Sequence, residues 1–145
     1  MTLAEALSEE AKREQVVDDC CQLVDDEVKK KSGLGGAVIK AGYAAVKGIK
    51  PGIIRKVVDK LFDAWVEQLE PFWQEAVDRG IAPDEHLEAE TPRVAEALLS
   101  VTDSRIDGAK TALIRKTYKK LRPSAKKHTE SAVPGLAAVL RKHVS

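Results

Sequence analysis

The stretch IIRKVVDKLFDAWVEQLEPFWQEAVDR, residues 53–79, decides the fold of this chain. Its apolar residues recur every three or four positions from Ile54 to Ala76, which is the spacing of one face of an α-helix. Further apolar residues widen that face, as expected for a helix that others enclose. The spacing keeps its phase across Pro71, so we expect one central helix about 40 Å long, kinked at this proline rather than broken there.

Helical spacing also predicts the elements around this central helix, and no segment has the alternation of a β-strand. We expect Pro123 to end one helix, Pro134 to kink or restart the next, and residues 81–90 to form a surface loop with at most a turn of helix. The sequence therefore predicts an all-α fold, a compact bundle of five or six helices in a single domain spanning residues 1–145. The predicted helices cover residues 9–31, 34–49, 53–79, 91 to between 103 and 108, 109–121 and 124–143.

The predicted helix at 34–49 has unusually small side chains. Ala37, Ala41 and Ala45 lie four residues apart, with Gly42 beside them, and such a thin face lets a neighbouring backbone come close. Larger apolar residues flank this row, so we expect most of the helix to be enclosed and tightly packed.

The composition describes a soluble globular protein of 145 residues, 43% hydrophobic, 32% charged and 4% aromatic. A chain of this length buries about two thirds of its unfolded surface, so it needs no metal or disulfide to hold a core. Disordered, collagen-like and disulfide-scaffold classes are excluded. The chain starts with acids where a secretory signal has bases and an apolar run, and no segment has the roughly 20 apolar residues of a membrane span. We therefore expect a cytoplasmic protein without a transmembrane segment.

The net charge of +1 hides four blocks of opposite sign. Residues 1–27 hold two bases and nine acids, residues 28–58 eight bases and no acid, residues 59–107 four bases and thirteen acids, and residues 108–145 ten bases and one acid. One interpretation is that antiparallel helices bring opposite blocks together. It does not account for Arg55 and Lys56, because they stand in the first turn of the predicted helix at 53–79, where cations are unfavourable and must answer to something outside their own helix.

The other interpretation is that the last basic block forms a surface for a polyanion, either nucleic acid or an anionic membrane. Clustered cations without acids four residues away are what phosphate binding needs. Base recognition usually adds exposed aromatic residues, which this segment lacks. The candidate residues for polyanion or partner binding are Arg115, Lys116, Lys119, Lys120, Arg122, Lys126 and Lys127.

The sequence identifies no catalytic residue, and we expect no metal and no cofactor. None of the three histidines, His86, His128 and His143, follows a glutamate by three residues, as in dimetal sites of helical bundles. Cys20 and Cys21 are adjacent on a predicted helix, about 100° apart, so we expect reduced thiols rather than a disulfide. The glycine-rich run at residues 32–36 lacks the Gly-Lys-Ser/Thr ending of a phosphate loop and is typical of a turn between helices.

Several longer strings resemble a bacterial family known as a domain of unknown function. They are KSGLGGAVIKAGYAAVKGIKPGII (residues 31–54), LEPFW (69–73), VAEALLSVTDSR (94–105) and YKKLR (118–122). The resemblance covers nearly the whole chain. It implies a small helical cytoplasmic protein and supplies no activity, ligand or catalytic residue.

Three functions remain open. The first is a non-enzymatic helical module that binds a protein partner or a second copy of itself. The second is polyanion binding through the basic segment. The third is a small-ligand pocket beneath the helix at 34–49, lined by Tyr43, Trp65 and Trp73.

Overall fold

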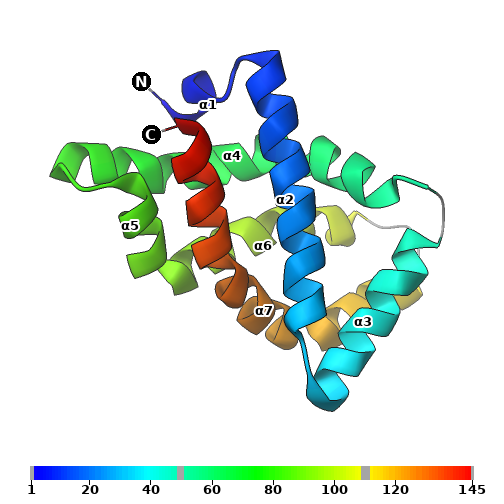
Figure 1. Ribbon diagram of the computed structural model, residues 1–145. Coiled ribbons are helices and arrows are strands. Elements are labelled where there is room, and N and C mark those ends of the chain that lie inside the picture. The colour runs from blue at the N-terminus through cyan, green and yellow to red at the C-terminus, as the bar shows by residue number, and fades with distance from the viewer. Residues whose placement is uncertain (1, 49–50, 109–111, 145) are drawn as a thin grey trace.

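The computed structural model describes residues 2–48, 51–108 and 112–144, apart from the side chains of residues 34, 107, 113, 114 and 117. These residues form helices without strands, which confirms the all-α prediction. The described part of the chain has seven helices rather than five or six: two short helices are added, and the two helices predicted at the C-terminal end form a single one (Figure 1). They are α1 (Leu3–Ala6), α2 (Glu10–Lys30), α3 (Gly33–Lys47), α4 (Ile53–Arg79), α5 (Pro83–Ala89), α6 (Thr91–Asp107) and α7 (Ala112–Val144).

The central helix of the bundle is α4, as the sequence predicts. It contacts α1, α2, α3, α5 and α6. Pro71 lies inside α4 on its exposed side, so the prediction that the helix continues through this proline is confirmed. On that side, water can satisfy the backbone carbonyl that the proline leaves without a donor. The buried side chains of α4 are Val58, Leu61, Phe62, Val66, Leu69, Phe72 and Ala76.

Helices α2 and α7 lie side by side and run antiparallel, with α4 and α6 behind them (Figure 1). Three contacts fix their register. The Asp19 carboxylate is 2.6 Å from the His143 ring, and the Ser131 hydroxyl donates to the Glu27 carboxylate at 3.2 Å. Between these two contacts, Gly135 lies so close to Leu23 that a Cβ atom there would overlap the leucine side chain. The small residue therefore lets the two helices approach each other.

The prediction that Pro123 ends a helix is wrong. One helix, α7, runs from Ala112 through Pro123 and Pro134 to Val144. Both prolines are exposed on the surface of α7. Contacts with α2, α5 and α6 hold α7 along its length, and this packing outweighs the local cost of a proline in a helix.

The prediction of a surface loop at residues 81–90 is also wrong, because Pro83–Ala89 form the helix α5. Pro83 stands in the first turn, where a proline is favourable. The side chains of His86 and Leu87 are buried against the bundle, and the His86 ring lies 2.9 Å from the Glu75 carboxylate of α4. A helix of seven residues is too short for its apolar spacing to be recognised in the sequence.

The prediction that the helix at 34–49 is enclosed is wrong as well. α3 lies at the edge of the bundle, where α2 and α4 contact it (Figure 1). Its small-residue row, Ala37, Ala41 and Ala45, is exposed, and the side chain of Val38 is 61% exposed. Neither α3 nor any other described helix is long and apolar enough to cross a membrane.

Candidate functional site

An open cavity of about 350 Å³ lies between α2, α4, α6 and α7. We call this cavity the cleft. Almost all of its surface is apolar. Val24, one of its lining residues, is 37% exposed and so stands at the rim. Other lining residues are Val16, Cys20, Leu23 and Val28 of α2, Phe62, Trp65 and Val66 of α4, Leu98 and Thr102 of α6, and Ala132, Leu136 and Leu140 of α7.

The two ends of the cleft differ in chemistry. At one end, Leu7, Val16 and Leu140 are all buried apolar residues. The other end holds most of the polar groups that line the cleft: Glu27 of α2, Lys31 directly after α2, and His128 and Thr129 of α7. Val16 and Lys30, the last residue of α2, are about 21 Å apart along the helix, and Lys31 follows directly. The cleft is therefore an elongated apolar space with one polar end.

Glu27 organises the polar end. Its side chain is 9% exposed, and its two carboxylate oxygens have different partners. One oxygen accepts a hydrogen bond from the Lys30 ammonium at 3.1 Å, and the other accepts one from the Ser131 hydroxyl at 3.2 Å. The Lys31 ammonium is farther away, 3.6 Å from the second oxygen. Glu27 thus has both of its oxygens satisfied without a hydrogen bond from Lys31.

His128 lies at the same end of the cleft. Burial, and secondarily the charge of Lys31, lower the pKa of the His128 ring below its ordinary value. The ring is therefore neutral at neutral pH, with one nitrogen that donates and one that accepts. Lys31 is the one fixed positive charge among the side chains that line the cleft within the described residues.

The cysteine in the cleft is unreactive. Burial, followed by the influence of Cys21 and Asp19, raises the pKa of the Cys20 thiol to about 12. Both cysteines are free, in line with the prediction of reduced thiols. In the ranges that the structure describes, no three His, Cys, Asp or Glu side chains are grouped so that they could hold a metal ion.

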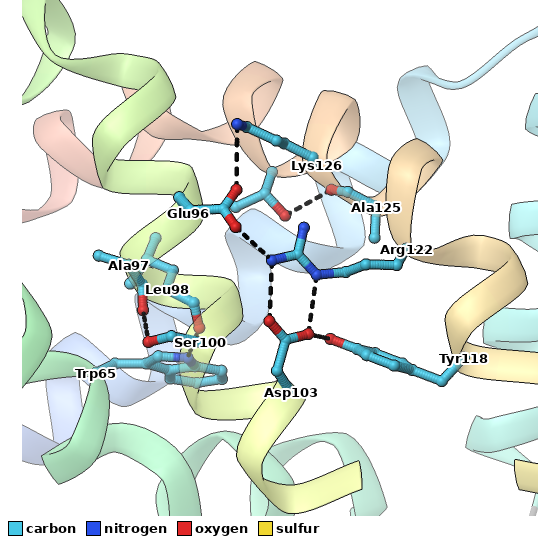
Figure 2. A network of polar contacts seen from close by, with 11 residues as sticks. Trp65, Glu96, Ala97, Leu98, Ser100, Asp103, Tyr118, Arg122, Ala125 and Lys126 are labelled. Carbon is cyan, nitrogen blue, oxygen red and sulfur yellow. Dashed lines mark hydrogen bonds and ion pairs between the residues drawn. The ribbon is translucent and has the colours of Figure 1, made fainter. Parts of the chain in front are cut away.

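The three aromatic residues predicted to line a pocket lie in different places. Trp65 lines the cleft, and its indole N–H donates to the carbonyl oxygen of Leu98 at 3.2 Å (Figure 2). Trp73 is half-buried against the hydrophobic core. Tyr43 is half-buried on α3, where the Lys47 ammonium lies 5.2 Å from the centre of its ring. Of the three, the structure brings Trp65 to the cleft.

Two of the predicted polyanion-binding cations, Arg122 and Lys126, form a network with acids of α6 (Figure 2). The Arg122 guanidinium donates to both oxygens of Asp103, at 2.8 and 2.9 Å, and to Glu96 at 2.8 Å. Lys126 pairs with the other oxygen of Glu96 at 3.1 Å, and the Tyr118 hydroxyl donates to Asp103 at 2.6 Å. These two cations already face carboxylates of their own chain.

Other charged blocks meet in the same way. Arg55 of α4 pairs with Glu14 and, at 2.8 Å, with Asp18, both in α2. Lys142 and His143 of α7 pair with Asp19 of α2. For these residues, the interpretation that antiparallel helices bring opposite blocks together is confirmed.

The remaining candidates of the basic segment lie on α7. Lys116, Lys119, Lys120 and Lys127 are exposed, and Arg115 is half-buried. Polyanion binding through these residues stays a prediction.

We expect Arg122→Ala to lower the free energy of unfolding by about 1 kcal/mol at pH 7, a modest figure because the acids of this network are partly exposed and screened by water. The hydrogen bond from Arg122 lowers the pKa of Asp103, and those from Lys126 and Arg122 lower the pKa of Glu96. A carboxylate with a lowered folded-state pKa stabilises the fold above its unfolded pKa and loses that contribution as the pH falls through the folded value.

The loss caused by Arg122→Ala should therefore shrink as the pH falls from 7 to about 3, because this range approaches the lowered folded-state pKa values of Asp103 and Glu96, at which protonation removes the charges that Arg122 pairs with. Urea unfolding of both proteins across this pH range measures the difference. Arg105→Ala, on an exposed arginine of α6, is the control and should change stability little. A loss independent of pH would show that the Arg122 side chain stabilises the fold by packing.

Sequence reasoning did not identify Glu27, Lys31 and His128 as residues of one site. Glu27 ends an acidic run, and Lys31 ends a basic triplet where the helix dipole favours cations. Both therefore have a sufficient local explanation. His128 is about a hundred residues farther along the chain, and no spacing in the sequence connects it to the other two.

Comparison with protein families gives one match. A model described as a family of unknown function (DUF6918) matches residues 3–144. No curated protein and no solved structure matches the chain significantly.

Proposed function

The chain belongs to this family of unknown function along nearly its whole length, and from the geometry of its cleft we propose that it binds a small, elongated apolar ligand. The observation that carries the proposal is a 350 Å³ space with apolar walls and a few polar groups at one end. Ligand pockets in proteins have this character, with volumes of about 300–1,000 Å³.

The energetics favour such a ligand. Each methylene group that moves from water into an apolar site contributes about 0.8 kcal/mol. A chain of eight methylenes would therefore gain about 6 kcal/mol before the cost of immobilising it. The walls come from four helices that pack on one another, so the site is formed by the fold itself rather than by a loop.

Filling the cleft should abolish binding of an apolar probe. We expect the neutral dye Nile red to bind the protein with a rise in fluorescence, and Ala132→Trp, which places an indole in the cleft from α7, to weaken binding at least tenfold. Ala138→Trp is the matched control, because Ala138 lies on the same helix, is exposed and does not line the cleft. It should bind the dye as the unchanged protein does.

A second variant, Thr102→Trp, fills the cleft from α6 and tests the same expectation if Ala132→Trp does not fold. Circular dichroism confirms that each variant is folded. The proposal fails if the unchanged protein does not bind the dye, or if folded cleft variants and the Ala138→Trp control bind it equally.

A protein-interaction module stays a prediction and is the second candidate function. The exposed apolar side of α3, with Val38 and Val46, favours it. Polyanion binding is less favoured, because Arg122 and Lys126 pair with Glu96. A cytoplasmic location also stays a prediction.

A further inference from the structure

We propose that the ligand of the cleft is a single-chain fatty acid whose carboxylate pairs with Lys31 and whose hydrocarbon chain extends towards Val16 and Leu140. This inference rests on the proposed function and adds to it the chemical class of the ligand. Three features of the cleft carry it: its charge, its hydrogen-bonding groups and its shape.

The charge at the polar end favours an anion. Glu27 carries the negative charge there and has two cationic partners, the Lys30 ammonium at 3.1 Å and the Lys31 ammonium at 3.6 Å. Lys30 is largely exposed, with 69% of its side chain accessible, whereas the Lys31 side chain is 12% exposed and lines the cleft. Counting Glu27, Lys30 and Lys31 together leaves one positive charge. Its source is an enclosed lysine, and a carboxylate in the cleft would neutralise it.

The hydrogen-bonding groups at this end are also suited to a carboxylate. A lysine ammonium has three donors, and the 3.6 Å distance to Glu27 is too long for a normal hydrogen bond. Within the described part of the chain, the structure assigns no hydrogen bond to the His128 ring. Lys31 and the donor nitrogen of His128 can therefore each approach a ligand oxygen. A carboxylate has two oxygens, and hydrogen bonds to a charged acceptor are the stronger ones.

The shape of the cleft favours a single chain. Its volume of about 350 Å³ is at the lower end of the range for ligand pockets, while α2 alone spans about 21 Å between Val16 and its last residue, Lys30. A long, narrow, apolar space that begins at a cation fits one hydrocarbon chain with one anionic head. Leu7 and Leu140, which line the far end, are both at most 3% exposed.

Displacement of Nile red by three twelve-carbon competitors tests this inference: dodecanoate, dodecanol and dodecyltrimethylammonium, each below its critical micelle concentration at pH 7.5. Against the unchanged protein, we expect dodecanoate to displace the dye at a concentration at least tenfold lower than dodecanol. The cationic competitor should be weaker than the alcohol, because Lys31 repels it.

Lys31→Gln should reduce the advantage of dodecanoate over dodecanol to less than threefold while dodecanol still displaces the dye. Lys29→Gln is the matched control: it removes a neighbouring charge, but Lys29 pairs with Asp25 rather than with Glu27 and does not line the cleft. It should keep the tenfold preference, and Lys31→Arg should restore most of it.

Two results would overturn the fatty-acid inference and leave the proposed function intact. One is displacement of the dye by dodecanol and dodecanoate at the same concentration. The other is an equal loss of preference in Lys29→Gln and Lys31→Gln, which would indicate general surface attraction. If neither Nile red nor dodecanol binds, the proposed function itself fails.

Discussion

Replacing Phe62 by alanine should lower the free energy of unfolding by about 3–5 kcal/mol, the usual cost of removing a buried aromatic side chain. Phe62 is 5% exposed and belongs to the main core cluster in the middle of α4. The Arg13 guanidinium lies 4.9 Å from the centre of its ring and is held there by a 2.7 Å ion pair with Asp59. The substitution would therefore also remove a cation–π contact between α2 and α4, worth roughly 0.5–1 kcal/mol.

Urea denaturation measures this loss, provided that the denaturant dependence of the unfolding free energy is unchanged. Val57→Ala is the control on the same helix, since Val57 is 44% exposed, and should cost less than about 1 kcal/mol. Because Phe62 also lines the cleft, its removal enlarges a space that already exists. Partial collapse of the walls would bring the loss towards 3 kcal/mol. A loss below about 1 kcal/mol would contradict the central position of α4 in the core.

Replacing Pro123 by alanine should have the opposite effect and raise the free energy of unfolding by about 2 kcal/mol. A proline inside a helix costs about 3 kcal/mol relative to alanine, since it lacks the backbone N–H and its ring crowds the carbonyl four residues earlier, here that of Lys119. About 1 kcal/mol of this gain is offset because alanine makes the unfolded chain more flexible. Pro123 is exposed, so no packing is lost.

Thermal unfolding followed by circular dichroism measures the gain. Pro83→Ala is the matched control with the opposite expectation: Pro83 stands in the first turn of α5, where a proline is favourable, so its replacement should leave stability unchanged or lower it. If Pro123→Ala lowers stability instead, the proline is acting as a helix start. The chain would then have two C-terminal helices in place of α7.

Local periodicity explains why the longer helices were predictable. In α2 and α4, enough turns follow one another for a repeat of three or four apolar positions to be recognised, and the observed bounds of Glu10–Lys30 and Ile53–Arg79 agree closely with the prediction. The same signal is absent from α5, which has only seven residues. A proline alone did not show where a helix ends. Pro71 and Pro123 both lie inside helices that contacts with other helices hold in place.

Burial on α3 could not be predicted for a different reason. The row of Ala37, Ala41 and Ala45 indicates a helix, but small side chains are as compatible with an exposed edge as with a close contact. The first turn of α3 does have such a contact, because a Cβ atom at Gly36 would lie 2.7 Å from the backbone carbon of Lys31. That contact joins the first turn of α3 to the end of α2, whereas the row of Ala37, Ala41 and Ala45 is exposed.

By itself, the sequence determined that the chain is helical, that residues 53–79 form its central helix, and that its charges alternate in blocks. These properties depend on the spacing of residues that are close together along the chain, so they can be recognised in the sequence alone. Only the tertiary structure decided which blocks pair, that Arg122 faces Asp103, and that Lys31 and His128 share one end of an apolar cleft. The physical reason is that the cleft forms only when the helices pack together. The antiparallel packing of α2 on α7 depends on contacts between side chains about a hundred residues apart, and no local spacing in the sequence specifies such contacts.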